Sequence, residues 1–247
     1  MRKIIFLMLL FCSLKGVSQG KFEVVDGGIG DNYGQSVQQT LDSGYIVAGS
    51  TSSIGYGSSD VYLFKLDTVG KVKWQHTYGG TNVDMGFSVQ QTKDHGYIIA
   101  GYTNSFGAGG YDFYLVKTDS IGNLQWQKTY GGANWDFAYS VKQTTDGGYV
   151  IVGGTYSYGK GNEDVYLVKT NAIGDTLWTK TYGGSGQDEG RSVWQNTDGG
   201  YFITGFTNSF GAGEFNSYLI RTNNLGGILW TKTIGDTVNQ AYSGQQT

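Results

Sequence analysis

The chain has 247 residues, of which 42 are glycine and none is proline, and a formal net charge of −3 at pH 7. Charged residues make up only 15% of the sequence, so it offers no basic surface for nucleic acid. The length suits one or two domains, and the unbroken repeat described below favours one.

The first 18 residues have the pattern of a secretory signal peptide. Residues 2–3 are basic, residues 4–14 are apolar, and residues 16–18 are small enough to suit cleavage directly after them. The apolar run is too short for a permanent membrane-spanning helix. The single cysteine, Cys12, lies inside this run after the bulky Phe11, which argues against a lipid anchor. We therefore expect a secreted or cell-surface protein without disulfide bonds.

The rest of the chain, residues 19–247, is built from a 52-residue repeat without insertions or deletions. The four complete copies are 26–77, 78–129, 130–181 and 182–233. Residues 19–25 align with the end of a preceding copy, and residues 234–247 restart a partial fifth. A repeat of this length is typical of solenoids, propellers and arrays.

The copy at 78–129 predicts four short strands separated by turn signals. The expected strands are residues 87–92, 97–103, 112–118 and 124–129. The first turn ends at Gly96, which we expect to adopt positive φ. Residues 97–100 and 113–116 are continuous apolar runs and predict strands covered on both faces, whereas residues 124–129 alternate as in a half-exposed edge strand.

Four-stranded units whose middle strands are covered on both faces, stacked on similar units, indicate an all-β fold: a β-propeller of four-stranded antiparallel blades. Because the fifth copy is partial, we expect an open arc. Trp126 and its equivalents are expected to pack between blades, where each would bury roughly 150–250 Å². These equivalents are Trp74, Trp178 and Trp230.

The residues around the last turn carry a resemblance to a known group. Residues 114–119 (YLVKTD), followed by Gly122 and Trp126, resemble the third-to-fourth-strand turn of quinoprotein-type β-propeller repeats. The whole unit is similar to the β-propeller repeats of secreted bacterial proteins, common in gliding bacteria, over residues 26–233. The resemblance implies the fold. It does not imply the activity of quinone-dependent dehydrogenases, which need a larger ring with a cofactor and metal site.

Because propeller strands alternate in direction, the loops divide between two faces. The turns near Asp94 and Asp119 are short, whereas residues 78–85 and 104–111 form longer loops on the other face, which we call the long-loop face. Residues that differ between the copies concentrate there, and loops on a rigid scaffold commonly carry binding sites. The residues that we expect to bind a ligand are Asn104, Phe106, Tyr111, Trp135, Tyr158, Phe210 and Phe215.

Two features of these loops allow two interpretations each. The Ser-aromatic-Gly-x-Gly stretches at 105–109, 157–161 and 209–213 could form one sugar pocket per blade, or glycine turns with a packed aromatic ring. The carboxylates of Asp84 and Asp112, with their equivalents, could hold Ca²⁺ or cap loop amides. The spacing matches no dense calcium loop, so we predict no metal site and no cofactor.

Catalytic constellations are missing from the sequence. His76 and His95 occupy different positions of the repeat without an obvious partner, so we expect both to be solvated. We predict a secreted non-enzymatic module that binds extracellular polysaccharide or protein, or serves as a scaffold, and that associates with itself through open blade faces. The alternative is a fragment of a propeller enzyme whose catalytic residues lie in blades outside this sequence.

Overall fold

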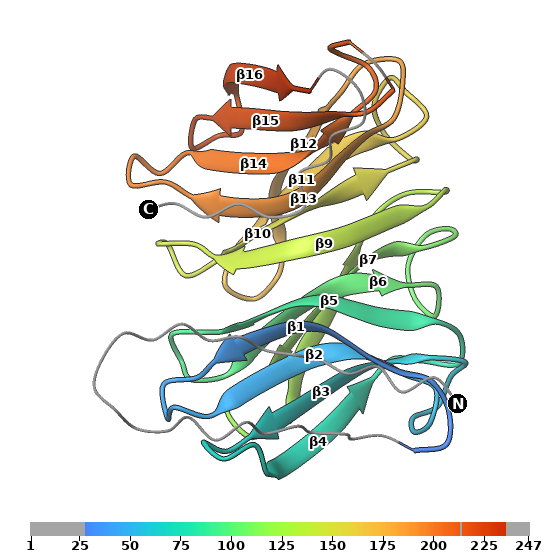
Figure 1. Cartoon of the computed structure of the whole chain (residues 1–247), viewed down its shortest axis with the longest axis vertical. Coiled ribbons are helices and arrows are strands. Elements are labelled where there is room, and N and C mark those ends of the chain that lie inside the picture. Colours follow the sequence, from blue (N-terminus) through green and yellow to red (C-terminus); the bar gives the residue numbers. More distant parts are fainter. Residues whose placement is uncertain (1–27, 213, 236–247) are drawn as a thin grey trace.

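The computed structural model describes residues 28–212 and 214–235, which form sixteen strands in four sheets (Figure 1). The first sheet contains β1 (Asn32–Gln39), β2 (Tyr45–Thr51), β3 (Asp60–Leu66) and β4 (Val72–Tyr78). The second contains β5 (Asp84–Gln91), β6 (Tyr97–Thr103), β7 (Asp112–Thr118) and β8 (Leu124–Tyr130). The third contains β9 (Asp136–Gln143), β10 (Tyr149–Thr155), β11 (Asp164–Thr170) and β12 (Thr176–Tyr182). The fourth contains β13 (Asp188–Gln195), β14 (Tyr201–Thr207), β15 (Asn216–Thr222) and β16 (Ile228–Ile234).

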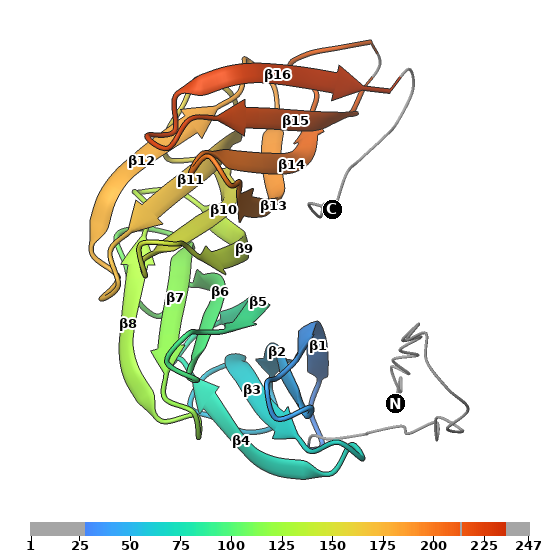
Figure 2. The ribbon, with the colours of Figure 1, turned by 90° about the vertical axis from the view of Figure 1, so that its left-hand side faces the viewer.

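Each sheet is an antiparallel meander whose strands lie in chain order. Figure 2 shows the four sheets stacked in a C-shaped arc, with β1, β5, β9 and β13 on its inner side and β4, β8, β12 and β16 on its outer side. We call these the inner and outer strands. The first and fourth sheets lie at opposite ends of the arc, so the ring is not closed. The chain is thus an open β-propeller arc, as the repeat predicts.

The core lies between successive sheets. The middle strands β6, β7, β10 and β11 are buried almost throughout, and three apolar clusters join the first sheet to the second, the second to the third, and the third to the fourth. The continuous apolar runs of the sequence are explained by this arrangement, because both faces of a middle strand contact another sheet.

Hydrogen bonds that recur between sheets explain several residues that repeat in the sequence. The hydroxyl of Ser88 accepts the N–H of Val141 in the next sheet at 3.3 Å. The hydroxyl of Tyr130 donates to the carbonyl of Gly174 at 2.7 Å. Equivalent bonds occur at the other two junctions. A residue that makes the same inter-sheet bond at each junction is required by the architecture.

The tryptophan prediction is confirmed at the three junctions that the structure describes. The Trp126 ring lies 5.8 Å from that of Tyr149 in the next sheet, and Trp74 and Trp178 lie 5.7 Å from the equivalent tyrosines. Trp230, in the last sheet, instead packs on Phe202 of its own sheet and is 43% exposed.

Two details of this copy differ from the sequence predictions. The strand expected at 87–92 begins at Asp84, because residues 84–86 already pair with β6. The positive φ of the following turn belongs to His95 (φ 64°) and not to Gly96. Glycine is needed at position 96 for space, since a Cβ there would lie 2.1 Å from the Thr118 carbonyl oxygen.

His76 is not simply solvated, because its Nε2 lies 3.0 Å from the carbonyl oxygen of Ile121 in the next sheet. The expected signal peptide (residues 1–18) and the partial fifth copy lie outside the described residues, apart from residues 234–235. No helix among the described residues is long and apolar enough to cross a membrane.

Candidate functional site: an aromatic cluster beside two buried glutamates

A polar network that recurs in successive sheets holds the long loops in place. Asp84 accepts hydrogen bonds from the Thr103 hydroxyl, from Ser105 Oγ at 2.7 Å and from the Gly80 N–H at 2.8 Å. Asp136 makes the same three bonds in the third sheet. The serine that begins each Ser-aromatic-Gly-x-Gly stretch is therefore part of the scaffold.

The aspartates that begin β3, β7 and β11 cap loop amides. Asp60 accepts the N–H groups of Tyr56 and Gly57 at 2.9 and 3.0 Å, and Asp112 accepts that of Ala108 at 2.9 Å. Burial raises the pKa of both aspartates. Capping is thus the interpretation that the contacts support. Within residues 28–212 and 214–235, no group of three or more metal-ligating side chains is positioned to hold an ion.

Four of the seven predicted binding residues belong to the loop scaffold. The Asn104 side-chain oxygen accepts the Val83 N–H at 2.8 Å. Phe106, Tyr158 and Phe210 occupy the same position in successive sheets. The ring centroid of each lies 5.4–5.9 Å from that of the tyrosine in the third strand of its own sheet. These stretches are glycine turns with packed aromatic rings, and each of the three aromatic residues remains partly exposed.

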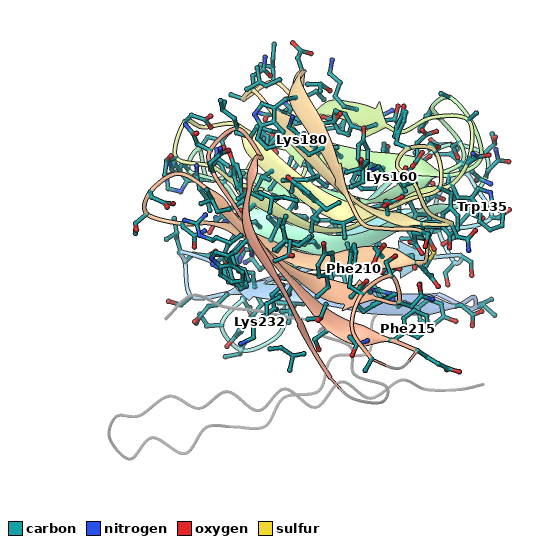
Figure 3. The ribbon with its side chains drawn as sticks, turned by 90° about the horizontal axis from the view of Figure 1, so that it is seen from above. Trp135, Lys160, Lys180, Phe210, Phe215 and Lys232 are labelled. Atoms are coloured by element: carbon teal, nitrogen blue, oxygen red, sulfur yellow. The ribbon has the colours of Figure 1, made fainter. Side chains whose placement is uncertain are left out.

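The other three residues divide into two places. Tyr111 and Trp135 lie together, with ring centroids 6.2 Å apart in a T-shaped arrangement. Phe215 packs separately on Phe206 of its own sheet at 5.3 Å. Figure 3 shows Trp135 and Phe215 on the same side of the molecule, with Lys232 toward the other side.

Trp135 belongs to a larger aromatic cluster at the junction of the second and third sheets. We define the aromatic cluster as Tyr102, Tyr111, Trp135, Phe137 and Tyr156. Trp135 lies 6.3 Å from both Phe137 and Tyr156. Trp135 is 54% exposed and Tyr156 is 37% exposed. These two residues therefore form the most exposed part of the cluster, whose other members are half-buried.

Next to Tyr156 lies a second group, which we call the glutamate cluster. Its members are Glu163, Gln187, Glu189 and Arg191. Glu163 is 1% exposed, and its Oε2 accepts hydrogen bonds from the Tyr156 hydroxyl at 3.0 Å and from Gln187 Nε2 at 2.6 Å. The carboxylate thus fixes two polar side chains at the edge of the aromatic cluster.

A departure from the repeat makes room for Glu163. Where the second and fourth sheets have Tyr102 and Phe206, the third sheet has Gly154. A Cβ at Gly154 would lie 2.0 Å from Glu163 Oε1, so any other residue would displace the carboxylate. Glu163 itself stands in the position of Tyr111 and Phe215. Two coordinated changes therefore replace an aromatic pair by a buried acid.

The second acid, Glu189, shares the buried environment. Glu189 is 4% exposed and forms an ion pair with Arg191, whose guanidinium lies 4.0 Å from the Tyr139 ring centroid. Burial, followed by the nearby Glu163 charge, raises the pKa of Glu189 to about 8. Burial also raises the pKa of Glu163. Both shifts favour a proton held by the pair, since two adjacent buried carboxylates cannot both ionise cheaply.

Sequence reasoning missed most of this arrangement. It selected Tyr111 and Trp135 but not Tyr156, Glu163 or Glu189. The sequence does contain a sign of this site, because Glu163 and Gln187 occupy two positions of the repeat whose residue differs in every copy. The acids weighed from the sequence were the aspartates that recur from copy to copy, whereas Glu163 and Glu189 each occur in one copy only.

The similarity of the chain to known proteins is distant. No family model matches the chain, and no curated protein matches it. Among solved structures, it is similar to a candidate gluconolactonase, at 12% identity and a TM-score of 0.40 over 83% of this chain and 60% of that one. It is similar to Sqt1 from Chaetomium thermophilum, at 12% identity and a TM-score of 0.39 over 85% and 62%. It is similar to BamB from Moraxella catarrhalis, at 16% identity and a TM-score of 0.35 over 85% and 79%. The chain spans about three fifths of the length of the first two.

Proposed function

We propose that the protein is a secreted, non-enzymatic β-propeller module that binds glycans on its long-loop face. The observation that carries the proposal is the exposed Trp135 ring beside Tyr156, whose hydroxyl is held by the buried Glu163. Exposed aromatic rings suit the apolar faces of sugar rings, and the neighbouring polar groups suit their hydroxyls.

The glutamate cluster determines which hydrogen bonds the site offers. Because the Tyr156 hydroxyl and the Gln187 amide both donate to Glu163, the outer lone pairs of Tyr156 Oη and Gln187 Oε1 remain available as acceptors. Sugar hydroxyls can donate to both. Glu163 is a positioning residue, since its carboxylate is buried behind the two groups that a ligand would meet.

Repetition adds to this site. Phe106, Tyr158 and Phe210 are each partly exposed, and each belongs to a separate sheet. Weak contacts with several sheets can combine into useful avidity on a polymer. A polysaccharide therefore suits the protein better than a monosaccharide.

The test is a glycan array probed with the parent chain and three variants. We expect Trp135→Ala, and the triple alanine variant at Tyr111, Trp135 and Phe215, to lose the signal. The control is Ile121→Ala, since Ile121 is 59% exposed in a short turn on the opposite face and lies outside both clusters. An array without signal, or a signal that Trp135→Ala retains in full, would leave the scaffold interpretation in place of glycan binding.

A further inference from the structure

Two junctions between inner strands share a side-chain hydrogen bond that the third lacks. Gln38 Oε1 accepts the backbone N–H of Gln91 at 2.7 Å, which joins β1 to β5. Gln90 Oε1 accepts the backbone N–H of Gln143 at 2.7 Å, which joins β5 to β9. The equivalent residue between β9 and β13 is Lys142. An ammonium group has no acceptor, so the bond cannot form there.

The departure puts a second donor, the lysine ammonium, on the strand next to an N–H group that has lost the acceptor found at the other two junctions. The backbone N–H of Gln195 occupies the position of the N–H groups of Gln91 and Gln143, and it lies opposite Lys142 in the repeat. The Gln195 side chain is engaged elsewhere, because its Oε1 accepts the Thr145 N–H at 2.8 Å and its Nε2 donates to the Gly199 carbonyl at 3.1 Å. No side-chain acceptor replaces the missing glutamine oxygen among the described residues.

Lys142 also differs from the lysines that the repeat requires. Lys65, Lys117 and Lys169 are buried and each pairs with an aspartate at 2.8–2.9 Å. Lys142 is half-buried, and within the described part of the chain its ammonium forms no ion pair. Burial lowers its pKa, because the charged form loses hydration without gaining a partner. A cost of this kind without structural compensation is typical of functional positions.

We propose that Lys142 Nζ and the backbone N–H of Gln195 together bind one oxygen of an anionic group, the carboxylate or sulfate of an acidic sugar. The anion oxygen takes the place that a glutamine Oε1 occupies at the other two junctions. A charged ligand is favoured over a neutral carbonyl, since it adds a charge-assisted bond to the lysine. The sugar component rests on the proposed function.

The inner side of the arc connects this position to the clusters described above. Phe87, Tyr139 and Arg191 occupy equivalent positions on β5, β9 and β13 and form a row. The Phe87 and Tyr139 rings lie 5.5 Å apart, and the Arg191 guanidinium covers the Tyr139 ring. None of these three residues recurs, so this inner row varies in the same way as the long loops. A chain of sugars lying along it would contact aromatic rings and reach Lys142.

The test measures binding of the full chain to oligogalacturonate, dextran sulfate and uncharged dextran. We expect the parent to bind at least one anionic probe about tenfold or more tightly than dextran, with the two anionic probes separating carboxylate from sulfate. Lys142→Gln should reduce that binding about tenfold or more. It should not lower the unfolding midpoint, because it restores the repeated hydrogen bond. Lys142→Arg should retain most of the binding, and Lys232→Gln, an exposed lysine on outer strand β16, should retain all of it.

Two results would overturn the proposal: binding of Lys142→Gln equal to that of the parent, or no binding of either anionic probe. Trp135→Ala in the same assay separates the two proposals. If Lys142→Gln abolishes binding while Trp135→Ala has no effect, the anion site stands and the long-loop site fails. If only Trp135→Ala reduces binding, the long-loop site stands and the anion site fails.

Discussion

At the scale of single residues, the junction between the third and fourth sheets is where the chain departs from its own repeat. Gly154, Glu163 and Glu189 replace larger or apolar residues of the neighbouring copies. Two buried acids do not stabilise the folded state, because removing carboxylates from water costs free energy that pairing recovers only in part. Their presence beside the exposed Trp135 is therefore better explained by a binding site than by stability.

The acids predict a pH dependence of stability. The pKa of Glu189 is about 8 in the folded protein against an ordinary value of 4.5, so the folded state retains a proton that the unfolded state releases. The unfolded state binds fewer protons in this window. The free energy of unfolding should therefore fall as the pH rises from about 4.5 to about 8, by on the order of a few kcal/mol.

Urea unfolding at pH 5, 6.5 and 8 measures this effect. Glu189→Gln should flatten the dependence, since a neutral amide does not titrate. A control, Asp175→Asn, removes an exposed acid on a turn and should leave the slope unchanged. A parent chain whose midpoint stays constant across this range would show that the pair does not share a proton.

At the scale of strands and sheets, the tryptophans of the outer strands join neighbours. Trp126 contacts Tyr149 of the next sheet and covers Gly174, where a Cβ would lie 2.8 Å from the indole ring. Trp126→Ala removes this contact and leaves a cavity, so we expect a loss of about 3–5 kcal/mol in the free energy of unfolding. Because repeat units share their stability, the adjoining interface should weaken as well.

Trp230 provides a matched control. It contacts Phe202 of its own sheet and is 43% exposed, so Trp230→Ala should cost only about 1 kcal/mol. Urea unfolding of both variants tests the difference. Equal losses for the two variants would contradict the inter-sheet role of Trp126.

At the scale of the whole molecule, the arc leaves the outward face of the fourth sheet without a described neighbour. Phe202 and Leu219 are partly exposed there, whereas the equivalent Ile98 and Leu115 are buried in the second sheet. Exposed apolar faces favour association. Sedimentation of the parent should therefore show a mass that rises with concentration.

A variant tests whether this face is responsible. The double substitution Phe202→Gln and Leu219→Gln should shift the protein toward the monomer. The control is glutamine at Ile121 and Ile173, two exposed isoleucines in turns of the second and third sheets. This control should not shift the protein toward the monomer. A parent chain that remains monomeric at all concentrations would disprove self-association through the end of the arc.

Sequence patterns predicted the strands best where turn residues flank them. β6 (Tyr97–Thr103) and β7 (Asp112–Thr118) match to the residue, because each is a continuous apolar or aromatic run between turns. The start of β5 was placed three residues late, because Asp84 and Gly86 have low strand propensity and pair only through their backbones. For the candidate site, the pattern selected Tyr111 and Trp135, which the structure brings together, and Asn104, which belongs to the loop scaffold.

The sequence by itself determined the architecture, because a 52-residue unit repeated without gaps requires each residue of the repeat to make the same contact in each sheet. Only the tertiary structure decided which departures from the repeat meet. Glu163 and Gln187 are 24 residues apart, and their side chains share a hydrogen bond. The two residues lie together because the third and fourth sheets stack, and that proximity across sheets cannot be read from local periodicity.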